Sequence, residues 1–498
     1  MGYRLGAFAD VGLSEGLLEA LLREHEERTL PTLRRFWSYY RNPAVGGSGR
    51  RVRLAQERGL PARLTGGVDA LRDDRSAQGR EVVIENDIAW RIHTMVDFMF
   101  GRPVGLSSAA GTPARRSEIE ALLRAALEAS GGVSLLQDVA LLGAVYGHVD
   151  LLVRTDELFV GSRGLRGVRS VSRALELARL VRVEVIEPTR GVPLLSPRDF
   201  RRIDAMIVRY QRAGRGVERE GIASRVPWLN SAMGGRPRRS AHEVLEILSA
   251  RRRQLYEDGR LLEDAPNPLG VLPVVHIQNT SQPFAYEGVS EVEPLIPLQD
   301  ELNTRLSDRA NRVTMQSFRM YLAKGVEGFA EAPVGPGQVW STENPEASVE
   351  AIGGDAASPS EDAHIEELRE AMDKASSITP VAAGVLRARL GSLSSENALR
   401  ITLLGALSKT ARRHVTYGRG LEEVCALILR ALDAAGVYST REEERGVRVR
   451  WPDPVPRDES ARLEAARLKI ELGVAPETAL GELGYAPRPD GGDAPGMD

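Results

Sequence analysis

The chain contains seven histidines and one cysteine, the residue types that most often bind metals or act as bases and nucleophiles. The histidines never occur as His-x-His or His-Glu-x-x-His, and His242-Glu243 has no second histidine one turn later. Cys425 lies in an apolar helical pattern, which indicates a reduced thiol in a core. We therefore expect no metal site, no cofactor and no disulfide.

Two other patterns could support nucleotide binding or catalysis. The chain has no Gly-Lys pair, which excludes the phosphate-binding loop Gly-x-x-x-x-Gly-Lys-Ser/Thr. The stretch GLSEG at 12–16 fits the Gly-x-Ser-x-Gly elbow of hydrolases, but that elbow follows a buried strand and none is expected here. We instead expect Ser14 to be the N-cap of a helix. No catalytic residue is predicted, and we do not expect an enzyme.

The length and the net charge of the chain limit which classes of protein remain possible. The 498 residues exceed the roughly 250–300 that one hydrophobic core supports, so two or more domains are expected. A formal charge of −3 excludes a protein that binds nucleic acid over its whole surface, so any DNA contact must be local. The first residues are too charged for a secretory signal, and no apolar run approaches the ~18 residues of a membrane span. We expect synthesis in the cytosol and no membrane partner.

The elements that could position a site fall into two regions. Up to Tyr286, helical patterns alternate with the strand-like runs VRVEVIEP, IDAMIVRY and LPVVHIQN. The apolar helix predicted from Ser134 to Val145 is expected to end at Tyr146-Gly147, where a strand begins. Beyond it, the amphipathic helices Leu295–Ser317 and Ser360–Thr379 flank an insert rich in glycine and proline. The fold class predicted is helix-rich α+β.

Finer signals mark both of these later helices. One flank of the first helix is polar without being strongly charged, through Asn303, Ser307, Asp308 and Asn311. The start of the second has the residues of a capping box, Ser358, Pro359 and Glu361.

A loop and a long helix follow. The loop PVAAGVLRARLGSLSSEN, residues 380–397, is too apolar for a solvent linker. The helical pattern Ser395–Ala435 has expected kinks at Gly405, Gly418 and Gly420. A last strand in GVRVRWPDPVP and two short helices complete the pattern.

Taken in order, several stretches resemble the portal proteins of tailed bacteriophages, of the siphophage type. The resemblance covers about Leu33 to Tyr485. It is carried by LRRFWSYYRNP, NDIAWRIHTMVDFMFGRPV, YGHVDLLV, NPLGVLPVVHIQN, GVSEVEPLIPLQDELNTRLSDRANRV and VRVRWPDPVPRDESARLEAARL. The stretch GSLSSENALR departs from the family pattern, because Glu396 and Asn397 stand where relatives often have glycine.

The resemblance implies a ring of twelve copies of the chain around a central channel. Transferred by segment, the parts are an N-terminal helix (1–32), a wing (33–286), a first stem helix (287–317), a clip (318–359), a second stem helix (360–379), a tunnel loop (380–394), a long kinked helix with the final wing strand (395–455), a crown (456–485) and a disordered tail (486–498).

The same resemblance implies a function at one vertex of a virion capsid. The ring would conduct double-stranded DNA during packaging and genome ejection, after synthesis in the host bacterial cytoplasm. It would dock terminase and then a head-completion adaptor and tail proteins, and would contact the major capsid and scaffolding proteins. The alternative is a minor virion structural or adaptor protein without a DNA channel.

Three sets of candidate site residues follow from this resemblance. The tunnel-loop set is Val385, Leu386, Arg387, Arg389, Leu390 and Ser392; its arginines would contact phosphates or, alternatively, acidic groups of the adjacent subunit. The stem set, facing the channel, solvent or a neighbouring subunit, is Glu361, Glu366, Glu367, Glu370 and Asp373. The clip set, for docking partners, is Phe329, Trp340 and Glu343, where Trp340 could equally be a core residue of the clip.

Overall fold

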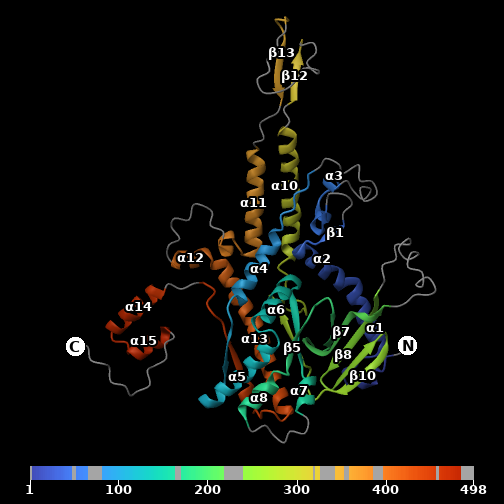
Figure 1. Ribbon diagram of the computed structural model, residues 1–498, viewed down its shortest axis with the longest axis vertical. Helices are drawn as coiled ribbons and strands as arrows, with labels where there is room; N and C mark the ends of the chain where they lie inside the picture. The colour runs from blue at the N-terminus through green and yellow to red at the C-terminus, as the bar shows by residue number, and fades with distance from the viewer. Residues whose placement is uncertain are drawn as a thin grey trace, which may run out of the picture.

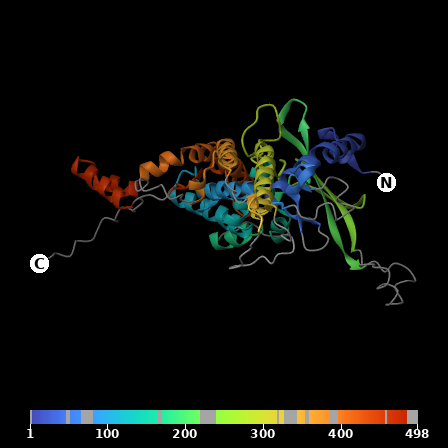
Figure 2. The same cartoon turned by 90° about the horizontal axis from the view of Figure 1, so that it is seen from above.

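The structure is a computed structural model of the chain, with a broad body from which a pair of helices rises (Figure 1). It describes residues 3–46, 52–65, 81–162, 170–217, 239–317, 320–325, 343–352, 358–384, 396–455 and 459–483. Seen from above, the N-terminal helices lie at one end of the body and the last two helices at the other (Figure 2).

The N-terminal arm is helical and begins where the sequence predicts. The Ser14 side chain accepts a hydrogen bond from the backbone N–H of Leu17 at 3.3 Å, which confirms Ser14 as the N-cap of α1. The chain then passes through a π-helical turn directly into the next helix. The elements of the arm are η1 (Leu5–Val11), α1 (Glu15–Glu24), the π-turn (His25–Thr29) and α2 (Leu30–Arg41).

The main core lies between helices and a three-stranded antiparallel sheet with strand order β11-β4-β5. Gly147, at a φ of +91°, ends α6 immediately before β4, which confirms the predicted Tyr146-Gly147 turn. The elements are α4 (Asp87–Phe100), α5 (Pro113–Ala129), α6 (Val133–Tyr146), β4 (His148–Arg154), α7 (Asp156–Gly161), α8 (Val171–Ala178), β5 (Arg182–Ile186) and β11 (Val274–Gln278).

A second antiparallel sheet, with order β10-β9-β8-β7-β6, packs one face on the N-terminal arm and the other on the first sheet. Its strands are β6 (Gly191–Ser196), β7 (Asp199–Val217), β8 (Arg239–Ser249), β9 (Arg252–Glu257) and β10 (Arg260–Pro266). Smaller elements of the body are β1 (Ala44–Gly46), β2 (Arg53–Leu54), η3 (Ala55–Gly59), α3 (Ala62–Thr65), β3 (Gly105–Ser108), η6 (Glu293–Leu295), η7 (Pro380–Ala383), η8 (Glu443–Arg445) and β14 (Val447–Arg450).

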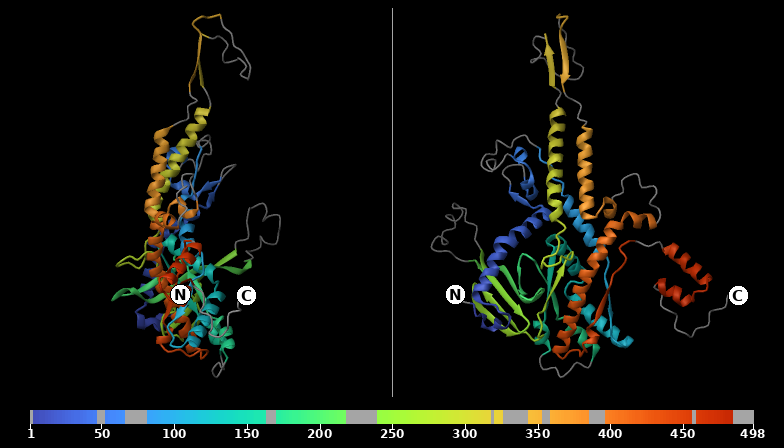
Figure 3. Two further views of the ribbon diagram at one scale, coloured as in Figure 1. Left: turned by 90° about the vertical axis from the view of Figure 1, so that its left-hand side faces the viewer. Right: turned by 180° about the vertical axis from the view of Figure 1, so that it is seen from behind.

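Two antiparallel helices, which we call the helix pair, rise from the body and end in a two-stranded hairpin (Figures 1 and 3). The elements are α10 (Ile296–Ser317), β12 (Met320–Lys324), β13 (Ser348–Ile352) and α11 (Pro359–Ser376), which confirms both predicted helices. The predicted capping box is wrong. Ser358 is the N-cap of α11, but its side chain makes no capping bond, and the Glu361 side chain forms an ion pair with Arg312 of α10.

The long C-terminal helix is interrupted once. A break at Leu403 separates α12 (Glu396–Thr402) from α13 (Leu404–Ala434), two residues before the expected kink at Gly405. The kinks expected at Gly418 and Gly420 are wrong, because α13 continues through both. A Cβ on Gly420 would lie 2.4 Å from Cγ1 of Ile277, so this glycine allows close packing of α13 on β11. The last described elements are α14 (Glu459–Glu471) and α15 (Pro476–Leu483).

Replacing Gly420 with alanine should therefore destabilise the body although alanine favours helices. The added methyl group overlaps Ile277, and we expect a loss of about 1–3 kcal/mol in the free energy of unfolding, measured by urea denaturation. The matched control is Gly405→Ala in the same helix, where the nearest atom lies at 3.4 Å, and where we expect a gain of about 0.5–1 kcal/mol. Equal effects of the two variants would contradict the packing role.

Candidate functional site at the base of the helix pair

Residues 81–87, which we call the strap, run in extended conformation along α10 and are held by side chains of that helix. The backbone N–H groups of residues 87, 85, 83 and 81 donate, in that order, to the side-chain oxygens of Gln299 (3.0 Å), Asn303 (3.0 Å), Ser307 (3.0 Å) and Asn311 (2.9 Å). Three of the four side chains also donate back to strap carbonyls. The polar flank of this helix is thus a ladder for an extended chain.

The ladder works because two repeats nearly coincide. Four residues of an α-helix rise about 6.0 Å, and two residues of an extended chain advance about 6.6 Å. A side chain at every fourth helical position therefore meets every second strap amide, which always points to the same side. The strap has no strand partner among the described residues, and the ladder supplies acceptors for four of its N–H groups.

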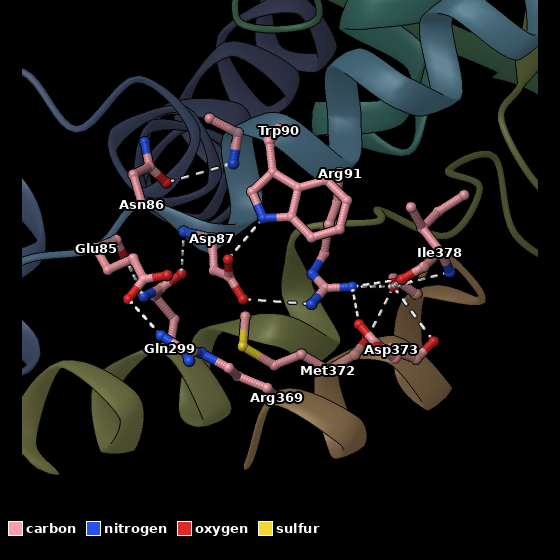
Figure 4. A network of polar contacts seen from close by, with 12 residues as sticks. Glu85, Asn86, Asp87, Trp90, Arg91, Gln299, Arg369, Met372, Asp373 and Ile378 are labelled. Atoms are coloured by element: carbon pink, nitrogen blue, oxygen red, sulfur yellow. Dashed lines mark hydrogen bonds and ion pairs between the residues drawn. The ribbon is translucent and has the colours of Figure 1, made fainter. Parts of the chain in front are cut away.

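The strap leads into α4, where Arg91 joins it to the other helix of the pair (Figure 4). The Arg91 side chain is 1% exposed and lies 3.3 Å from the Asp87 carboxylate and 2.7 Å from that of Asp373 on α11. It also donates to the carbonyl of Ile378 at 2.5 Å, and its guanidinium lies over the Trp90 ring at 4.4 Å. A buried cation with two carboxylates and an aromatic face is held in one geometry.

A second buried cation approaches the same helix end from α13. The Lys409 amino group forms an ion pair with Glu291, which precedes α10, and donates to the carbonyl of Ser376 at 2.8 Å. The C-terminus of a helix carries partial negative charge and unpaired carbonyls, so both cations stabilise the last turn of α11. Ser377 then leaves the helix at a φ of +59°, in the left-handed region.

The strap also contacts α11 directly, through an ion pair at 2.9 Å between Glu85 and Arg369 (Figure 4). The strap and α11 cover much of α10, so that among residues 296–314 only Pro297 and Val313 are exposed as whole residues, although the side chains of Arg305 and Arg309 are 38% and 39% exposed. On α11, by contrast, ten of the 18 residues are exposed. The exposed acidic residues of α11 are Asp362, Glu366, Glu367 and Glu370. Its exposed basic residue is Lys374.

The five predicted stem residues divide between these two environments. Glu361 (16% exposed) and Asp373 (23%) form ion pairs with Arg312 and Arg91 of the same chain. The other three are open to solvent with one-turn neighbours of α11 as their ion-pair partners: Glu366 (51%), Glu367 (77%) and Glu370 (70%).

The remaining predicted residues mostly lie outside the described part of the chain. This holds for the complete tunnel-loop set, for the tail from residue 486, and for Phe329 and Trp340. Glu343 is described and exposed at the hairpin end of the helix pair.

A buried polar cluster in the three-stranded sheet was missed from the sequence. Nδ1 of His276 lies 2.8 Å from the Asp150 carboxylate, Nε2 lies 2.8 Å from the carbonyl of Tyr286, and the Tyr286 hydroxyl donates to Asp150 at 2.8 Å. Burial opposes charge on the ring, but Asp150 raises the pKa of His276; burial lowers the pKa of neighbouring His148 to about 4. With both nitrogens of His276 facing acceptors, His276 and Asp150 form an ion pair within the core.

The other reactive groups of the described residues are also structural. Cys425 is a free, buried thiol, as predicted, and burial together with Glu422 raises its pKa to about 12. Among the described residues no three His, Cys, Asp or Glu side chains are grouped to hold a metal ion. No single described helix is long and apolar enough to cross a membrane; one bent pair, α5 with α6, passes by length and composition only.

Comparison with known proteins gives one family. The family model described as phage portal protein, SPP1 Gp6-like, matches residues 21–484, nearly the whole chain. The chain belongs to the phage portal protein family. No curated protein matches the chain. Portal proteins are structural proteins of the bacteriophage virion, which agrees with the mixed helix and strand fold and with the structural character of the buried polar groups.

The ladder generates a prediction for this portal protein. Asn303→Ala leaves the N–H of Glu85 and the side-chain Oε1 of Gln56 without the partners that Asn303 supplies, and we expect a loss of about 2 kcal/mol in the free energy of unfolding. Amide hydrogen exchange at Glu85 should accelerate more than exchange in the three-stranded sheet.

The matched control is Arg305→Ala on the open side of α10. That side chain pairs with Glu301 at the surface, so the loss should stay under about 1 kcal/mol. If exchange at Glu85 were the same in both variants, the strap would not be held by the ladder.

Proposed function

We propose that this protein forms a closed ring of twelve chains at one vertex of a capsid and conducts double-stranded DNA. In this proposal the helix pair is the stem, the β12–β13 hairpin belongs to the clip, the body is the wing, and α14 with α15 is the crown. The family match supports the portal role. The observation that supports a role as a DNA conduit is that α11 is more exposed to solvent than α10.

The exposed face of α11 has the electrostatic character that a DNA conduit needs. Every phosphate that a protein neutralises adds affinity, which a sliding duplex would have to break. The exposed charged residues on α11 are four acids and one lysine, so a ring would repeat an acidic band around its channel. Glu366, Glu367 and Glu370 are the proposed channel residues, whereas Glu361 and Asp373 hold the stem together.

The partners are proposed from the same arrangement. The hairpin end of the helix pair, where Glu343 is exposed, is the farthest point from the body and would dock terminase and later the head-completion adaptor (Figure 1). The body would contact the major capsid and scaffolding proteins. The tunnel-loop residues Arg387 and Arg389 stay candidates for contact with phosphates or with the adjacent subunit.

Assembly is the first test. Native mass measurement of the purified chain should give a ring of roughly 650 kDa, twelve times 54.3 kDa, and negative-stain images should show a central hole. A population of monomers and small oligomers without a hole would contradict the proposal and favour an adaptor without a DNA channel.

Charge reversal tests the channel face. In the ring, replacing Glu366, Glu367 and Glu370 with lysine should raise the affinity for a DNA duplex at least tenfold, with a steep loss of that gain as salt rises. Fluorescence anisotropy of a labelled duplex measures both. The control is lysine at Glu19, Glu157 and Glu176, exposed on the body, which gives the same net charge. Equal affinity of the two variants would show that α11 does not face the DNA.

A further inference from the structure

The two-helix unit of α14 and α15 has no hydrophobic core of its own. The two helices pack mainly on each other, and only Ala466 and Ala479 are buried among their described side chains. The exposed apolar residues in and between these helices are Leu463, Leu468, Ile470, Leu472, Val474 and Leu480. Two helices this short cannot bury enough apolar surface to be stable by themselves, so another surface must cover them.

Apolar residues lie on two opposite sides of α14. Leu463, Ala466 and Ile470 share one side, and buried Ala466 shows that α15 packs there. Leu468 is five residues from Leu463, about 140° around the helix, and Leu472 follows it one turn later. A helix with two apolar sides lies between two partners, and the side of Leu468 and Leu472 lacks its partner among the described residues.

A second uncovered face lies on the first half of α13. Leu404 and Val415 are 62% and 72% exposed. With the small exposed residues Ser408 and Ala411 they are spaced by four, three and four positions, which is the spacing by which helices pack side by side. These four residues, which we call the seam, span about 17 Å, and the 13 residues of α14 span about 20 Å.

We infer that α14 of one chain packs, through Leu468 and through Leu472 just beyond its C-terminal end, on the Leu404–Val415 seam of a neighbouring copy. In its own chain α14 lies beyond α12, away from the body (Figures 1 and 2). A ring joins two different faces of the same chain at every contact, so one copy's unpartnered helix can meet the next copy's unpartnered seam. This inference rests on the proposed ring and assigns one of its interfaces.

Cysteine cross-linking between full-length chains tests the contact. A tagged Leu404→Cys chain and an untagged Leu468→Cys chain are assembled together and oxidised. We expect disulfide dimers that unite the two chains, at least tenfold more than with the control pair Val160→Cys and Leu468→Cys, because Val160 is exposed on α7 of the body. Native Cys425 is buried and stays unreacted.

A second measurement does not depend on cysteine geometry. Leu468→Glu with Leu472→Glu should raise the protein concentration for half-assembly at least tenfold, whereas Val160→Glu should leave it unchanged. Rings of normal mass without cross-links above the control, or a bond formed only within one chain when both cysteines are on it, would overturn the inference and leave the proposed function standing. An unmodified chain that forms no ring would overturn both.

Discussion

The helix pair depends on two buried cations that meet at the C-terminal end of α11. Arg91 and Lys409 come from two helices of the body and donate to the carbonyl of Ile378, just beyond the helix, and to that of Ser376, its last residue. Desolvating a guanidinium or ammonium group costs several kcal/mol, and here that cost is offset by carboxylates and by the partial charge of the helix end. The anchor therefore joins the end of α11 to α4 and α13.

The strap complements the anchor on the other helix. The cations hold the end of α11, and the ladder holds α10 along its length. Both helices of the pair are therefore bound to α4 and to the strap. These polar contacts add to the apolar packing of Leu302, Leu306 and Met372 against α2 and α4. Because the polar side of α10 is used for internal bonding, the acidic exposed side of α11 is the one left for a function outside the chain.

Local signals in the sequence were sufficient for most element boundaries. Ser14 as an N-cap, the turn at Gly147, and the two amphipathic patterns around the hairpin depend on residues within a few positions of one another, and each is confirmed. The polar flank of α10 was visible, but its partner lies more than 200 residues earlier in the chain, and nothing local marks residues 81–87 as extended.

The wrong predictions also concern residues whose partners lie far away in the sequence. Glu361 has the position of a capping residue, but it pairs with Arg312, which a neighbouring helix supplies. Glycine within a helix often marks a kink, but Gly420 instead makes room for Ile277 of a distant strand, because it has no side chain. Of the proposed channel residues, the sequence could identify acidic positions but could not separate Glu366, Glu367 and Glu370 from Asp373, because burial by Arg91 is decided by tertiary packing.

The repeat distances of the strap and of α10 differ slightly. Each rung of the ladder accumulates a mismatch of about 0.6 Å, so three steps from Gln299 to Asn311 use up about 2 Å that must be absorbed by side-chain rotation. Side chains of different length, a glutamine first and a serine later, take up this drift while the four bonds stay between 2.9 and 3.0 Å. Because the mismatch grows with every added step, there is an upper limit on how much of a helix an extended chain can follow in register.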